Sequence, residues 1–142
     1  MSDVTIVEVD NELHAKTDMP TGTRMVRVAV PTDRPVTVHA AVNARLLQEA
    51  RVFDGEGKMH FEWQGRGDGR TIGCGSRTFE HAPLLIGCLS YQDDIWIVND
   101  LNVRSEIADN GDHKVTIYCE DGGDFPGDWD DLVVTTSWSG SA

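Results

Sequence analysis

The sequence predicts an all-β fold, an antiparallel β-sandwich of about eight or nine strands. Short β-branched or aromatic segments recur along the chain, and Gly, Pro, Asp and Asn separate them. The segment LVVTTSW at 132–138 shows the clearest alternation, because every second side chain from Leu132 to Trp138 falls on one face. A period of two residues is typical of a sheet with one buried side. The number and spacing of such segments favour a sandwich over a parallel sheet.

The expected strands, in chain order, are Val4–Val9, Arg24–Val30, Val36–Val42, Lys58–Trp63, Leu84–Tyr91, Ile95–Val98, Lys114–Cys119 and Leu132–Trp138. The segment 40–52 (AAVNARLLQEARV) suits a helix by composition, yet it continues a strand-like run without a clear cap, so a helix and a strand with a hairpin both remain open. The glycine-rich stretch 65–75 is expected to form hairpin turns. A chain of 142 residues fits one domain covering 1–142.

The charge balance argues against two classes of binding partner, nucleic acids and anionic membranes. There are 24 acidic and 12 basic residues, for a net charge of −12. Such a chain repels phosphate backbones and anionic lipid, so we expect no nucleic acid partner and no membrane insertion. The first residues lack the basic and apolar regions of a Sec signal, which predicts a protein that is cytoplasmic or released by another route.

The cysteines and histidines give no catalytic or zinc pattern. Cys74, Cys88 and Cys119 are odd in number and have no CxxC spacing, so we expect free, mostly buried thiols in a reducing compartment. The five histidines are scattered, with neither HxH nor HExxH spacing. We therefore expect no catalytic residues, and a protein that is not an enzyme.

The most informative segment is EDGGDFPGDWDD at 120–131, which packs six carboxylates, three glycines and a proline between two expected strands. Its acids are Glu120, Asp121, Asp124, Asp128, Asp130 and Asp131. Like charges held this closely repel, and a divalent cation removes the repulsion. A dense, all-oxygen, flexible loop favours calcium over magnesium, as one or two ions. A solvated acidic loop without a metal is the alternative.

This loop and the strand after it resemble the calcium-dependent bacterial lectins of the fucose-binding lectin II family, small β-sandwiches that bind fucose or mannose through two neighbouring calcium ions. EDG at 120–122 is similar to the start of the family's loop, DWDD at 128–131 to its end, and LVVTTSW to its closing strand. A weaker similarity lies at PTGTR, 20–24. The chain departs from the family around 125–127, in its middle third and in a longer tail.

The resemblance implies a ligand set and a sugar site. The implied calcium ligands are Glu120, Asp124, Asp128, Asp130, Asp131 and the backbone carbonyl of Thr32. The implied sugar-binding residues are Asp33, Arg34, Asp121, Gly123 and Asp124. The expected function is therefore a calcium-dependent lectin for fucose-like or mannose-like carbohydrate, as a homodimer or higher homo-oligomer.

Two other functions are alternatives to the lectin. In a calcium-stabilised structural or interaction domain, the ions only brace the sandwich and no sugar binds. A hydrolase using paired carboxylates needs two acids in unlike environments across a cleft, which one acidic loop does not provide.

Overall fold

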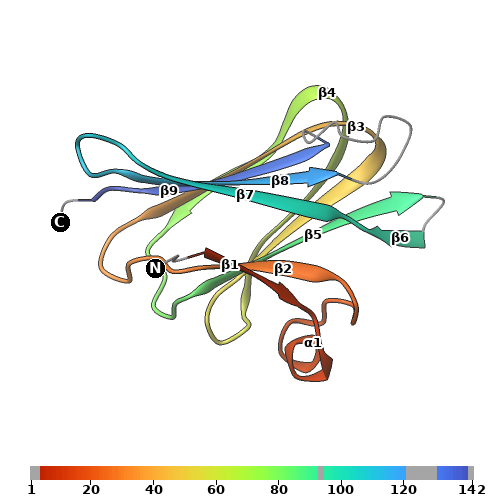
Figure 1. The fold of residues 1–142 in the computed structure, drawn as a ribbon, viewed down its shortest axis with the longest axis horizontal. Coiled ribbons are helices and arrows are strands. Elements are labelled where there is room, and N and C mark those ends of the chain that lie inside the picture. Colours follow the sequence, from red (N-terminus) through yellow and green to blue (C-terminus); the bar gives the residue numbers. More distant parts are fainter. Residues whose placement is uncertain (1–3, 93–94, 121–130, 141–142) are drawn as a thin grey trace.

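The computed structural model describes residues 4–92, 95–120 and 131–140 of the chain (Figure 1). In this part the elements are β1 (Val4–Glu8), α1 (Asn11–Thr17), β2 (Arg24–Val28), β3 (Val36–Phe53), β4 (Met59–Arg77), β5 (Leu84–Gln92), β6 (Ile95–Val98), β7 (Asp100–Ile107), β8 (His113–Glu120) and β9 (Leu132–Trp138). All of the strand pairs between them are antiparallel. The predicted all-β antiparallel fold is confirmed.

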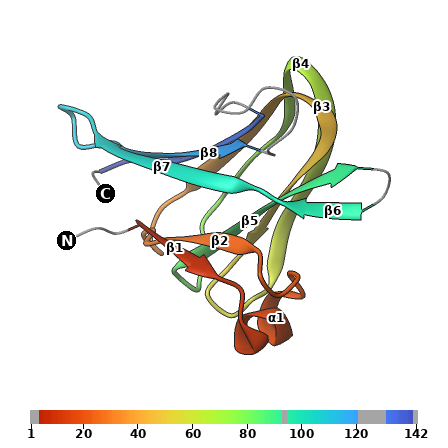
Figure 2. The same ribbon diagram turned by 45° about the vertical axis from the view of Figure 1, so that its right-hand side comes forward.

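The long strand β3 joins the two halves of a single sheet. The sheet order is β1-β2-β5-β3-β9-β8-β7, with β4 also on β3 and β6 also on β5. The first part of β3, from Val36, pairs with β9, and its last part, up to Phe53, pairs with β5. The sheet therefore folds over on itself into a nearly closed, barrel-like arrangement, with β7–β9 facing β1, β2 and β5 (Figures 1 and 2).

The core lies between these two halves and explains why 40–52 is a strand. Val36, Val38, Ala40 and Val42 are all buried, as the period of a strand requires. They pack with apolar residues of the facing strands, among them Ile86, Ile117, Leu132 and Val134. Of the two possibilities left open for this segment, the structure therefore contains the strand.

A second apolar cluster lies on the outer face of β2 and β5, where α1 and the loop after it cover the sheet. It consists of Val9, Met19, Met25, Phe53, Leu85 and Leu89. The helix begins at Asp10, whose side chain accepts a hydrogen bond from the backbone N–H of Leu13, and it ends at Asp18 in the left-handed conformation. The sequence-based element list omitted this helix. No helix in the described residues is long and apolar enough to span a membrane.

The glycine-rich stretch 65–75 belongs to strand β4, so the expectation of hairpin turns there was wrong. A Cβ atom at Gly73 would lie 2.0 Å from a ring carbon of Trp63, and one at Gly75 would lie 2.5 Å from a ring carbon of Phe61. The missing side chains let these two rings lie flat on the strand, where they stack with centroids 4.9 Å apart. The glycines thus make room for aromatic packing.

The cysteine prediction is confirmed for free thiols. Cys88 and Cys119 are buried and Cys74 is exposed. Burial, followed by the neighbouring Cys88 thiol and the negative charge of Asp131, raises the pKa of Cys119. Cys119 is therefore a buried apolar side chain at the end of β8, and its neighbours in sequence carry the polar groups of that end.

Candidate metal and sugar site

The ends of β7, β8 and β9 and the interior of β3 bring polar residues into one row. The ladder between β8 and β9 runs to the pair Cys119 and Leu132, so Glu120 and Asp131 are the next positions across from one another. On one side Glu120 pairs with Asp100 of β7. On the other side the backbone N–H of Asn43 in β3 donates to the carbonyl oxygen of Asp131 at 3.1 Å.

This row lies where the chain enters and leaves the acidic segment. Glu120 is only 6% exposed, whereas Asn43 lies at the surface. Asp100 is also largely exposed, and its carboxylate is 3.8 Å from the guanidinium of Arg24, an ion pair of the kind that contributes little to stability. A carboxylate as buried as Glu120 is costly unless hydrogen bonds or a cation compensate for it.

The local structure of β3 explains why Asn43 reaches this position. Pairing with β9 ends at Val42, and the register of β3 against β4 shifts between Val42 and Ala44 and again between Ala44 and Gln48. Such irregularities bend a strand and re-aim its side chains. The segment 43–46 therefore leaves the regular ladder directly beside Asp131.

The donor chemistry of the row fits a hard cation. Carboxylate, carbonyl and amide oxygens are the ligands that calcium takes in proteins. Among the described residues no group of three or more His, Cys, Asp or Glu side chains is placed to hold a metal ion. Five of the predicted site residues, Asp121, Gly123, Asp124, Asp128 and Asp130, lie outside the described residues. Three of the predicted ligands have described positions: Glu120, Asp131 and Thr32.

The structure does not bring Thr32, Asp33 and Arg34 to this row. They precede β3, whose first residue, Val36, pairs with Trp138 at the far end of β9. Seven residues of strand separate positions 36 and 43, a span of roughly 23 Å. In this register Asn43, and not Thr32, lies beside Asp131.

Arg34 has a different set of contacts at that far end. Its guanidinium donates to the carboxylate of Asp33, at 2.9 and 3.1 Å, and to the carbonyl oxygen of Ser139 at 2.9 Å. The hydrogen bond from Arg34 holds the pKa of Asp33 below its usual range. This pair ties the start of β3 to the end of β9.

One feature of the sequence indicates the irregular segment 43–46 of β3, which the sequence-based prediction missed. Asn43 and Arg45 interrupt an otherwise apolar run, and asparagine is depleted in strands and enriched in turns. A polar break in the middle of a long strand indicates a bulge, which is where the structure places it. The weak similarity at 20–24 drew attention to an earlier loop instead.

Beyond the bulge, β3 carries two buried polar residues whose partners are internal. Ser90 donates to the side-chain oxygen of Gln48 at 2.8 Å, and Tyr91 donates to the carboxylate of Glu49 at 3.3 Å. Arg51 also forms an ion pair with Glu49. Burial, and then the charge of Glu49, raises the pKa of Tyr91. These contacts bind β3 to β5.

Comparison with known proteins adds independent information. The sequence profile of the family described as fucose-binding lectin II (PA-IIL) matches residues 28–140. Comparison with curated protein sequences gives no significant match.

Three solved structures share the fold. A high-affinity mannose-binding lectin of Ralstonia solanacearum is 20% identical, with a TM-score of 0.62 over 78% of this chain and 92% of that one. The Chromobacterium violaceum lectin CV2L, solved in complex with α-methyl-fucoside, is 17% identical, with a TM-score of 0.62 over 78% and 92%. The C-terminal domain of the BC2L-C lectin of Burkholderia cenocepacia is 18% identical, with a TM-score of 0.60 over 78% and 91%. The match over 28–140 covers most of the chain, which therefore belongs to the fucose-binding lectin II family.

Proposed function

We propose that the protein is a calcium-dependent lectin in which one or two calcium ions, held by the segment 120–131, take sugar hydroxyls as ligands. The carrying observation is the row formed by Asn43, Asp131 and Glu120 at the base of the acidic segment, within the residues that match the lectin family. Family membership supports carbohydrate as the ligand and a non-enzymatic role.

The proposed calcium ligands are Glu120, Asp124, Asp128, Asp130 and Asp131, completed by an oxygen of Asn43 in place of Thr32. Calcium binds six to eight oxygens in flexible geometry, so vicinal hydroxyls of a sugar can complete its shell. Among the protein residues, Asp121, Gly123 and Asp124 face the same sugar in this proposal. Arg45 replaces Asp33 and Arg34 as the residue that tunes specificity, because it is exposed and two residues from Asn43.

The sugar is proposed to be of the fucose or mannose type. This rests on two proteins with the same fold, a mannose-binding lectin and a lectin in complex with α-methyl-fucoside. Assembly into a homodimer or higher homo-oligomer is proposed with it, since two or more weak sites on one particle multiply avidity without any new contact. Light scattering in calcium buffer measures the assembly.

A glycan array run with calcium and with chelator tests the proposal. Glu120→Gln and Asp131→Asn remove one charge each from the row with little change in shape, so both should abolish calcium-dependent binding. Asp33→Asn removes the same charge at the far end of β3 and serves as the matched control. Loss of binding in Asp33→Asn alone would return the site to the loop before β3.

The calcium-stabilised structural domain is the second candidate. The carboxylate oxygens of Glu120 are of the kind that calcium binds, whether or not sugar binds as well. Under this alternative calcium raises the melting temperature, and no glycan on the array binds.

A further inference from the structure

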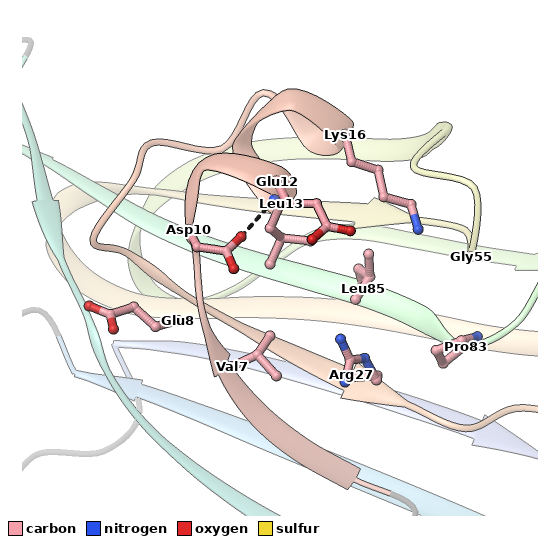
Figure 3. Close-up of a pocket in the computed structure, with 10 residues that line it drawn as sticks. All are labelled: Val7, Glu8, Asp10, Glu12, Leu13, Lys16, Arg27, Gly55, Pro83 and Leu85. Carbon is pink, nitrogen blue, oxygen red and sulfur yellow. Dashed lines mark hydrogen bonds between the residues drawn. The ribbon is translucent and has the colours of Figure 1, made fainter.

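A cavity of about 400 Å³ lies between α1, the strands β1 and β2, and the turn between β3 and β4 (Figure 3). Its apolar part is formed by Val7, Leu13, Pro83 and Leu85. Five charged side chains line the rest of it. This size and this mixture of apolar surface with a few polar groups are typical of small-molecule sites.

The walls of the cavity are held in place by close packing. Met19 is fully buried, and a Cβ atom at Gly87 would lie 2.6 Å from its terminal carbon. The turn between β3 and β4 is equally close to the helix, because a Cβ at Gly57 would lie 2.5 Å from Cγ of Lys16. Asp10 caps α1 through its hydrogen bond to Leu13, at 2.8 Å. The cavity therefore exists before any ligand binds.

The cavity holds both signs of charge. Lys16 and Arg27 lie on two sides of Leu85, the carboxylate of Glu12 lies between Asp10 and Lys16, and Glu8 lies farther away beyond Val7 (Figure 3). The side chains of Lys16 and Arg27 form no ion pair or hydrogen bond within the described parts of the chain. In a protein with a net charge of −12, two cations so close to carboxylates and still unpaired remain available to an external anion.

The cavity is distinct from the proposed sugar site. Seven of its ten lining residues lie between positions 7 and 27, before the range that matches the lectin family. Leu85 pairs with Phe53 at one end of the long strand β3, and Asn43 lies ten residues away along that strand, outside the lining of the cavity. The N-terminal segment thus adds a pocket to the matched region.

We propose that this cavity binds a short apolar peptide whose two ends are free. The terminal carboxylate lies between Lys16 and Arg27, where a guanidinium can bind it through two hydrogen bonds. The terminal ammonium lies against Asp10 and Glu12, and the apolar side chains cover Leu85. Each end of such a ligand meets the opposite charge, and its middle meets the apolar surface.

The test is a titration of the full chain with the dipeptide leucyl-leucine, followed by methyl NMR of Leu13 and Leu85. The expected result is saturable shifts of both methyl groups, with the N-acetylated and the C-amidated dipeptide each binding about tenfold or more weakly. Free leucine is a further arm, and tighter binding of leucine than of the dipeptide would overturn the assignment to a peptide.

Two variants locate the charges. Arg27→Gln should weaken the parent dipeptide about tenfold and leave the C-amidated form unaffected, since that form lacks the carboxylate. Asp10→Asn should weaken the parent and spare the N-acetylated form, while asparagine still caps α1. Arg104→Gln, an exposed change on β7, is the matched control and should bind normally. Absence of saturable shifts up to tens of millimolar dipeptide, or equal binding of all three forms, would overturn the proposal.

Discussion

Replacing Glu120 by glutamine should remove most of the stabilisation that calcium gives the protein. Glu120 is 6% exposed and lies across the β8–β9 ladder from Asp131, so the backbones at these two positions are roughly 5 Å apart. Two carboxylates about 5 Å apart would repel by roughly 3 kcal/mol at an effective dielectric constant of about 20. A cation bound between them replaces this repulsion by attraction.

The magnitude follows from linkage between binding and folding. Calcium at about a hundred times its dissociation constant stabilises the folded chain by about 2.7 kcal/mol, which for a chain of this size raises the melting temperature by about 10 °C. Glu120→Gln should lose most of this shift.

The assay is thermal melting followed by circular dichroism, with calcium and with chelator, for the wild type, Glu120→Gln and Asp33→Asn. The Asp33 variant changes the same charge far from the row, so it should keep the full calcium shift. An equal calcium shift in the wild type and in Glu120→Gln would refute the assignment of this carboxylate as a ligand.

Three further predictions concern the fold. Met19→Ala, which empties a fully buried site against Gly87, should lower the free energy of unfolding in urea by about 2–5 kcal/mol, and a loss below about 1 kcal/mol would contradict the packing described. Burial would raise the pKa of Asp54, but hydrogen bonds from His60 at 3.0 Å and from the backbone N–H groups of Lys58 and Glu56 outweigh it and lower the pKa below its usual value. The stability this gives is present above the unfolded pKa of about 3.9 and is lost as the pH falls through the lower folded value, so the stability difference between wild type and Asp54→Asn should shrink in acid and not grow. In the folded protein a maleimide should label Cys74 alone among the three thiols, with Cys88 and Cys119 reacting only in denaturant; rapid labelling of Cys119 without denaturant would show that the end of β8 opens.

Alternation predicted the strands that have one buried face. LVVTTSW appears as β9 with the predicted bounds, because its apolar residues recur every second position and its partner strands bury only that side. The same principle failed for β4, where glycines take the place of apolar residues. There the aromatic rings of Trp63 and Phe61, near the start of β4, lie over Gly73 and Gly75, near its end. Composition does not reveal such a contact between two parts of one strand.

Strand β7 and helix α1 were missed for a different reason. Most of the side chains in β7 are exposed, so its pattern is mainly polar and its pairing with β8 depends on backbone hydrogen bonds. The helix α1 has only seven residues, and its stability comes from the cap at Asp10 and from packing of the segment on β2 and β5. Both elements therefore form because of tertiary contacts and not because of local sequence preference.

The sequence predicts the acidic part of the candidate site, whereas the register of the strands determines which other residues lie beside it. The density of carboxylates predicts a metal site where two strands end, and the β8–β9 ladder, which runs to Cys119 and Leu132, makes Glu120 and Asp131 the next positions at that point. Which residue from the first half of the chain lies beside Asp131 depends on the register of β3 against β9. That register places Asn43 beside Asp131 and Thr32 about 20 Å or more from it. It results from the pairing of β3 with β9, two strands nearly a hundred residues apart in the sequence.

The central claim is that sugar binds through calcium, and calorimetric titration of the wild type with α-methyl-fucoside and α-methyl-mannoside tests it most directly. With saturating calcium, at least one of the two glycosides should give saturable heats, because its vicinal hydroxyls complete coordination shells that the oxygen ligands leave open. Chelator should reduce those heats to the heat of dilution, and added calcium should restore them. Saturable binding that persists in chelator, or heats of dilution alone for both sugars in saturating calcium, would contradict the account.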